Sequence, residues 1–252
     1  MPIRFPNVVA AVLAIVWSFP GSLTAQAGRP VTGASAVPPA PRWPDGRVSL
    51  GSTPDQKGYW EIRPGLLVLP RPDDVPLQPW ARALSEYRAS TDLFPPLVRC
   101  IPAGGPSFFN APGVEIVDVP ELERIYVLNI AGAHSWRVVY TDGRRHPAPA
   151  DLRPTFLGHS VGHWEKDTLV IDSVGFNEKQ WVAGTYPTTE RLHLIERISR
   201  PDLKTLEYEF TIDDPGAYTR PWSGRWTISQ TTKSSWMPGG EIFEYICQDS
   251  RG

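Results

Sequence analysis

The sequence predicts a mainly β protein with one N-terminal helix, in which an antiparallel barrel of the lipocalin-like or calycin-like kind is the first choice and a β-sandwich the second. After Cys100, short runs of alternating or continuous apolar residues follow one another, and turn dipeptides such as Asp142-Gly143 separate them. No helical pattern lies between these runs, which argues against a doubly wound sheet. The 28 prolines, 21 glycines and 10 tryptophans fit a turn-rich protein with an aromatic core.

Residues 1–27 have the features of a cleavable secretory signal peptide. Arg4 supplies positive charge, an apolar run extends from Val8 to Phe19, and Ala25-Gln26-Ala27 provides a small-residue end. The apolar run is shorter than the ~20 residues that a membrane-spanning helix needs. We therefore expect a secreted or periplasmic protein with no integral membrane segment after cleavage.

The remaining chain is expected to consist of two parts. Residues 28–57 are rich in proline and small residues without a period, which predicts a flexible Pro-rich arm. Residues 58–252 are expected to form a single β-rich domain. Its one credible helix covers Pro79 to Ser90, because Pro79 suits the first helical position and the apolar residues of this segment, among them Trp80 and Tyr87, share one stripe.

The predicted strands have the β-branched and aromatic composition of antiparallel sheets. They are VEIVDV, RIYVLNI, SWRVVY, HWEK, TLVIDSVGF, RLHLIERIS, TLEYEFTI, GRWTIS and EIFEYIC. Tight turns are expected at Lys166-Asp167 and at Pro201-Asp202.

Cysteine usage and net charge limit the possible partners. In an oxidising compartment Cys100 and Cys247 are expected to form a disulfide, with two free thiols or a metal pair as the alternative. The net charge of −2 gives no field that favours nucleic acid or an anionic membrane. The oligomeric state is not predictable.

Residues 158–162, GHSVG, match the G-x-S-x-G nucleophile elbow of serine hydrolases. An elbow needs a helix after the serine, but a turn and a β-branched run follow Ser160. A serine esterase with a Ser160 nucleophile, Asp167 or Asp172 and His193 is therefore only the third functional hypothesis.

The stretch GHSVGHWEKDTLVIDSVGFN, with YTDGRRHP before it and LHLIER and IDDPGAYTRPW after it, resembles a group of secreted bacterial proteins for which no function is settled. The resemblance covers Arg99 to Gln248 and includes both cysteines. This chain has His163 where the group usually has arginine, and Lys166 where it usually has glycine. The resemblance implies export and assigns no chemistry.

Acids on apolar strand faces are the first candidates for catalysis. Glu196 shares its face with leucine and isoleucine, and Asp172 shares its face with valines. Such an acid either pairs with a base or has a raised pKa suited to a general acid or base. The structural alternative, an ion pair with an arginine such as Arg137, Arg191 or Arg197, remains open.

The histidines add a donor to this hypothesis. His159 lies between glycines at the start of the longest strand run, where it could donate a proton or polarise an oxygen. His193 is a candidate for substrate binding or for an ordinary surface position, and His146, which follows a turn, is expected to be a surface group. A metal site is not expected, because His159 and His163 lie ~13 Å apart on an extended strand.

Aromatic strand faces suggest a ligand. Trp136 and Tyr140 share a face, and so do Tyr208 and Phe210, which in a barrel could line a cavity for an apolar or aromatic small molecule. The first hypothesis is a cofactor-independent acid/base enzyme of lyase, isomerase or hydrolase type, with Glu196 or Asp172 as the base. The alternative is a non-catalytic carrier of the same kind of molecule.

Overall fold

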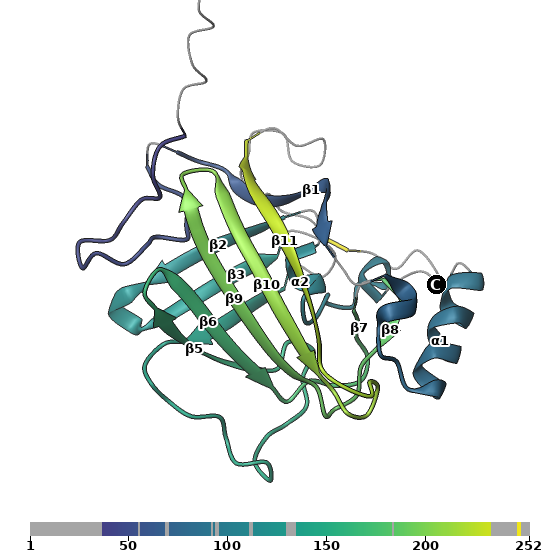
Figure 1. Ribbon diagram of the computed structural model, residues 1–252. Coiled ribbons are helices and arrows are strands. Elements are labelled where there is room, and N and C mark those ends of the chain that lie inside the picture. Colours follow the sequence, from purple (N-terminus) through teal and green to yellow (C-terminus); the bar gives the residue numbers. More distant parts are fainter. Residues whose placement is uncertain are drawn as a thin grey trace, which may run out of the picture. The chain divides into compact units, whose positions relative to one another are not determined.

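The computed structural model describes residues 37–54, 56–68, 71–91, 93, 96–110, 113–129, 135–182, 184–232 and 246–247. Nine described strands close into one barrel (Figure 1). Around the wall they are β1 (Tyr59–Val68), β11 (Trp222–Thr231), β10 (Thr205–Asp213), β9 (His193–Asp202), β6 (Thr168–Val174), β5 (His159–Glu165), β4 (Trp136–Tyr140), β3 (Arg124–Asn129) and β2 (Val114–Val119). The barrel prediction is confirmed, in preference to the sandwich.

The strands alternate between buried and accessible positions. In β9 and β10 every second residue is buried, because successive side chains of a strand point to opposite faces of the sheet. Large aromatic side chains fill much of the interior, among them Trp60, Tyr208, Phe210 and Trp226. Burial of each such side chain stabilises the fold by about 1.5–3 kcal/mol relative to exposure.

The predicted turns are confirmed in one case and displaced in the other. Lys166 and Asp167 form the β5–β6 turn, and Lys166 has a left-handed backbone with φ of 56°. Pro201 and Asp202 belong to β9, so the turn prediction there is wrong, and the chain reverses after them. The turn lies two residues later, at Leu203 and Lys204, where the Asp202 carboxylate accepts a hydrogen bond of 2.8 Å from the Lys204 amide.

One neighbouring pair of strands departs from the antiparallel expectation. Strands β4 and β5 run parallel, with Val139 opposite Ser160 and Tyr140 opposite Val161. A parallel pair requires a long crossover between its strands. Residues 141–158 provide this crossover as a long loop, at the bottom of Figure 1. Strand β5 consequently begins at His159, before the predicted start of HWEK.

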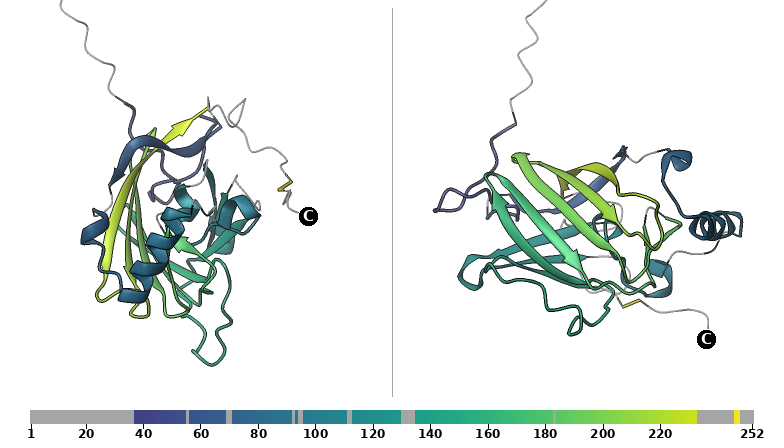
Figure 2. Two further views of the ribbon diagram at one scale, coloured as in Figure 1. Left: turned by 90° about the vertical axis from the view of Figure 1, so that its right-hand side faces the viewer. Right: turned by 60° about the horizontal axis from the view of Figure 1, so that its bottom comes forward.

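Helix α1 (Pro79–Ser90) has the predicted bounds but not the expected buried face. Ala81 and Ser85 are its buried residues, whereas Trp80 is 47% exposed and Tyr87 57% exposed. The helix lies beside the barrel (Figure 2) against a separate ribbon of β7 (Trp181–Val182) and β8 (Tyr186–Pro187). The Ser85 hydroxyl bonds to the Thr185 hydroxyl at 2.8 Å, and this polar contact selects the buried face.

The shorter helical elements connect the strands. They are η1 (Pro72–Asp74), η2 (Pro96–Arg99), α2 (Ser107–Asn110) and η3 (Pro120–Leu122). Helix α2 contributes Phe108 and Phe109 to the core, both fully buried. The Phe109 ring lies 4.5 Å from the Tyr208 ring, centroid to centroid, so α2 is packed onto the barrel interior.

The segment expected to be a flexible arm is only partly described. The described part of this segment is not an exposed arm throughout: residues 37–47 are mostly exposed or half-buried, but Val48 and Leu50 are buried in the core. The buried Arg200 guanidinium donates hydrogen bonds of 2.7 Å to the carbonyls of Ser49 and Gly51, which holds this segment against the barrel. The predicted signal peptide, and the arm up to residue 36, lie outside the described residues.

The two cysteines form the predicted disulfide. Cys100 and Cys247 have Cα atoms 5.6 Å apart and are separated by 147 residues. Such a long loop gives a stabilisation of about 4–5 kcal/mol by chain entropy. A disulfide is compatible with an oxidising compartment. Of the predicted strand EIFEYIC, which spans residues 241–247, residues 241–245 lie outside the described residues.

Candidate functional site

The barrel wall separates the predicted site residues into two groups. Glu196 and Tyr208 point into the barrel and are fully buried. Tyr140, His159, Asp172 and His193 have the opposite parity on their strands and lie on the outer face. Trp136, on the same outer face of β4, is 62% exposed. One cavity therefore does not collect all of these residues.

Inside the barrel, Glu196 is paired with Arg137. Arg137 donates a hydrogen bond of 3.1 Å to Glu196 Oε1 and a second, shorter one to Oε2. The Tyr208 hydroxyl donates to Oε1 at 2.7 Å. The structural alternative for Glu196, an arginine pair, is the arrangement found.

The interior around this pair is filled by rings. Tyr208 stacks on Trp226 at 5.0 Å between centroids and contacts Phe109 from α2. Burial raises the pKa of the Tyr208 hydroxyl well above its usual value, and the neighbouring Glu196 carboxylate adds to this. The inner group is thus a packed polar network, and its acid has both oxygens engaged.

Outside the barrel, three histidines and one acid form a hydrogen-bonded chain, which we call the histidine cluster: His146, His159, Asp172 and His193. His193 Nε2 lies 2.8 Å from Asp172 Oδ1, and His146 Nε2 lies 3.2 Å from the same oxygen. His146 Nδ1 lies 2.9 Å from His159 Nδ1. The chain therefore runs from His193 through Asp172 and His146 to His159.

Strand register explains why these residues meet. On β6, Asp172 stands opposite Val161 of β5 and Ile195 of β9. His159 and His193 are each two residues from those partners, so both are diagonal neighbours of Asp172 on the outer face. His146 comes from the crossover and bridges Asp172 and His159.

His193 and His159, at the two ends of the hydrogen-bonded chain of side chains, have pKa values shifted in opposite directions. The hydrogen bond to Asp172 raises the pKa of His193 above its usual value, despite partial burial. Desolvation lowers the pKa of His159, and the nearby His146 and Arg144 lower it further. The hydrogen bond from His193 lowers the pKa of Asp172, so a raised pKa, as expected for an acid among valines, is not found at Asp172.

Two side chains from the crossover side extend the cluster. The Tyr140 ring stacks on the His159 ring at 5.4 Å between centroids. The Arg144 guanidinium lies 3.9 Å from the Tyr140 centroid and is held by Asp142. Sequence reasoning missed Arg144 and treated His146 as an ordinary surface candidate, because neither lies on a periodic segment. Their only sequence signal is the RRHP run after the Asp142-Gly143 turn.

The remaining predictions concern metal and serine chemistry. Among the described residues, no group of three histidine, cysteine or acidic side chains is arranged to hold a metal ion. Ser160 is 1% exposed, and its hydroxyl pairs with the Ser173 hydroxyl at 2.8 Å within the barrel wall. This strand position differs from a nucleophile elbow, so the geometry lends the esterase hypothesis no support.

Comparison with protein-family models, curated proteins and solved structures finds no match to this chain. Among the described helices, none has the length and apolar character needed to cross a membrane.

Proposed function

We propose that this protein is an exported, cofactor-independent acid/base enzyme whose active site is the histidine cluster on the outer face of the barrel. One observation carries the proposal: two histidines at opposite ends of a single hydrogen-bonded chain have pKa values displaced in opposite directions. Environments that separate the pKa values of neighbouring groups are typical of acid and base pairs in enzymes.

The hydrogen-bond directions assign the base. The Asp172 carboxylate accepts, so His146 donates to it through Nε2, and in a neutral His146 ring Nδ1 is then the acceptor. His159 must therefore donate through Nδ1, which leaves its Nε2 with a lone pair. Because the pKa of His159 is lowered, its ring is neutral at physiological pH. In this proposal Nε2 of His159 therefore acts as the general base, in place of Glu196 or Asp172, and not as the proton donor that the sequence suggested.

His193 supplies the acid in this proposal. Its raised pKa favours the protonated ring, in which Nε2 donates to Asp172 and Nδ1 carries a second proton. Asp172 orients His193 and His146 directly, as the acid of a catalytic triad orients its histidine, and His146 in turn orients His159. The substrate is an apolar or aromatic small molecule positioned by Tyr140 and Trp136, and the reaction is of lyase, isomerase or hydrolase type.

The test uses panels of small aryl substrates, one with an activated C–H bond and one of esters. Replacement of His159 with glutamine removes the base, and general base catalysis is worth ~10²- to 10⁴-fold in rate. The matched control is His163→Gln, because His163 lies on the same strand, is exposed, and within the described structure has its side-chain hydrogen bond with Glu165, at 3.3 Å, rather than with the histidine cluster. The turnover of wild type should rise with pH as His159 loses its proton.

Equal rates in wild type and His159→Gln would overturn the proposal. Asp172→Asn should lower turnover as well, because an amide no longer fixes the tautomer of His146. Retention of a co-purified small molecule without any turnover would instead favour the carrier alternative.

A further inference from the structure

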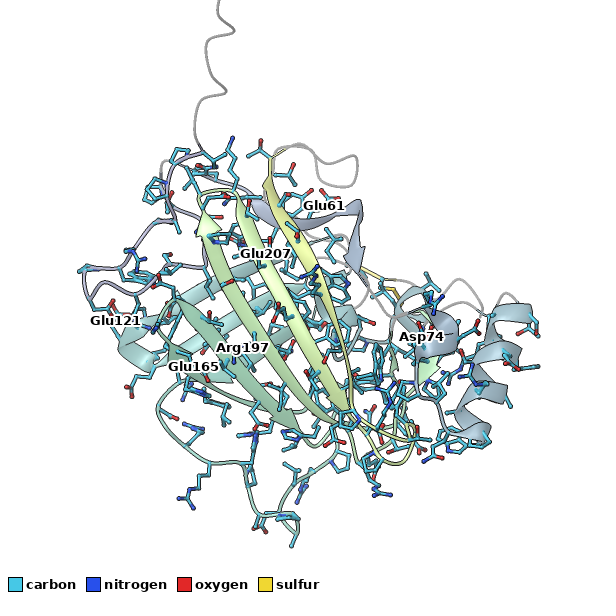
Figure 3. The ribbon with its side chains drawn as sticks, in the orientation of Figure 1. Glu61, Asp74, Glu121, Glu165, Arg197 and Glu207 are labelled. Carbon is cyan, nitrogen blue, oxygen red and sulfur yellow. A yellow bond between two sulfur atoms is a disulfide. The ribbon has the colours of Figure 1, made fainter. Side chains whose placement is uncertain are left out.

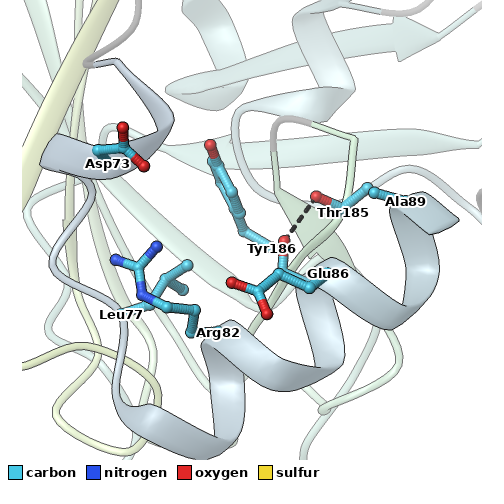
Figure 4. Close-up of a pocket in the computed structure, with 8 residues that line it drawn as sticks. Asp73, Leu77, Arg82, Glu86, Ala89, Thr185 and Tyr186 are labelled. Carbon is cyan, nitrogen blue, oxygen red and sulfur yellow. Dashed lines mark hydrogen bonds between the residues drawn. The ribbon is translucent and has the colours of Figure 1, made fainter.

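A pocket lies between α1 and β8, and it shares no residue with the histidine cluster. This pocket has a volume of about 320 Å³. That size is at the lower end of small-molecule sites, which span about 300–1,000 Å³. Asp73 of η1, Arg82 and Glu86 of α1, and Tyr186 of β8 surround it, with Leu77 behind Arg82 (Figure 4).

The charged side chains of the pocket are not paired with one another. Within the part of the chain that the structure describes, Asp73, Glu86 and Arg82 take part in no ion pair. The Arg82 guanidinium donates a hydrogen bond of 3.1 Å to the Val75 carbonyl, and among the described residues it has no acidic partner. Figure 4 shows the Glu86 carboxylate and the Arg82 guanidinium projecting from neighbouring turns of the helix toward the same space.

Tyr186 adds a neutral polar group between these charges. Partial burial raises the pKa of its hydroxyl, with Arg82 opposing the shift and Asp73 adding to it. The phenol hydroxyl therefore interacts electrostatically with both charged side chains, and it stays protonated at physiological pH. The Tyr186 ring meets the Trp222 ring edge to face at 6.1 Å, which fixes its orientation.

We propose that this pocket binds a small zwitterion that carries one ammonium and one carboxylate group, the chemistry of a free amino acid with an apolar side chain. The ligand carboxylate pairs with Arg82 and accepts from the Tyr186 hydroxyl. The ammonium group lies between Asp73 and Glu86, and the apolar side chain contacts Leu77.

The mixture of charges selects this class over simpler ligands. A plain cation would pair with the carboxylates of Asp73 and Glu86 but would leave the Arg82 guanidinium without an anionic partner. A plain anion would face the two carboxylates of Asp73 and Glu86. Only a ligand with both charges satisfies each side of the pocket, since specificity rests on repulsion of the wrong partner as well as attraction of the right one.

The experiment compares three probes by saturation-transfer NMR with the full chain. The probes are leucine, N-acetyl-leucine, which lacks the ammonium group, and isoamylamine, which lacks the carboxylate. We expect saturation transfer to leucine, and affinities weaker by about tenfold or more for the two analogues, because each loses one charge-assisted contact.

Two variants locate the site. Arg82→Gln and Glu86→Gln should each weaken leucine binding by about tenfold, as expected for loss of one charged hydrogen-bond partner. Glu190→Gln, an exposed acid that does not line the pocket, is the matched control and should bind as wild type does. Thermal melts confirm that each variant is folded.

Three outcomes overturn the proposal: no transfer to leucine, equal binding of leucine and isoamylamine, or leucine binding that neither pocket variant weakens. None of these outcomes depends on catalysis at the histidine cluster.

Discussion

Replacing Glu196 with glutamine should lower the free energy of unfolding by about 3–5 kcal/mol, the cost of breaking a buried ion pair from one side. Glutamine keeps the volume and one acceptor oxygen, so the effect isolates the charge. Arg137 is 3% exposed and Glu196 is fully buried, which leaves no solvent to compensate the guanidinium once the carboxylate is gone. Burial opposes the Arg137 charge, yet the pKa of Arg137 is raised, because Glu196 outweighs burial.

The assay is urea unfolding followed by tryptophan fluorescence. The control is Glu165→Gln, which breaks the surface pair between Glu165 and Arg197, 2.8 Å apart and visible on the outer wall in Figure 3. Exposed pairs of this kind contribute about 0–1 kcal/mol. A further variant, Arg137→Met combined with Glu196→Gln, should recover part of the loss because no unpaired charge remains buried.

A loss in Glu196→Gln no larger than that in Glu165→Gln would refute the reasoning, since the interior pair would then be as well solvated as a surface pair. The same variant separates structure from chemistry. If Glu196 has only a structural role, the folded fraction of the Glu196→Gln variant should turn over any substrate at the wild-type rate.

Three further predictions concern the turn, the disulfide and the histidine cluster. Lys166→Gly should raise the free energy of unfolding by up to about 1 kcal/mol in urea titrations, because glycine adopts the positive φ of this turn without strain, and a decrease would contradict that account. Cys247→Ser should lower it by about 2–5 kcal/mol, measured without reductant, and a change below that range would show that the bridge contributes little. Because the folded pKa of His193 is raised, its pairing with Asp172 stabilises the protein fully below pH about 6.5 and is lost as pH rises through the folded pKa. Asp172→Asn should therefore lower the free energy of unfolding more at pH about 5.5 than at pH about 8.5. The difference should be no more than about 1 kcal/mol, because the side chains of His193 and Asp172 are 38% and 40% exposed. NMR titration of the variant should show the pKa of His193 falling.

Local rules in the sequence were sufficient for several features. The start of α1 follows from Pro79 at the first helical position. The face it buries does not follow, because the Ser85 contact with Thr185 joins residues distant in sequence. Periodicity identifies a stripe, and only the tertiary partner decides whether that stripe faces the core.

The alternation of side chains along the strands likewise predicted some features correctly and was misleading for another. It correctly separated Glu196 from His193, and it correctly grouped Asp172 with Val170. The apolar neighbour was misleading, because Val170 is only 6% exposed although it lies on the outer face. His163 of β5 and Arg197 of β9 stand opposite it in register, so Val170 lies between two longer side chains on the outer face. A buried valine therefore does not mark the inner face of a barrel strand.

The departure from the antiparallel pattern and the histidine cluster have one origin. A tight hairpin after β4 would return the chain antiparallel and leave no segment long enough to lie over the outer wall. The parallel β4–β5 pair instead requires the crossover 141–158, which carries Arg144 and His146 to the outer face. The crossover ends at Gly158, where φ is 67° and a Cβ atom would lie 2.7 Å from the Val174 carbonyl oxygen. That close approach seats the start of β5 against β6 and places His159 within hydrogen-bond distance of His146, so the topology that sequence patterns missed is also what assembles the proposed active site.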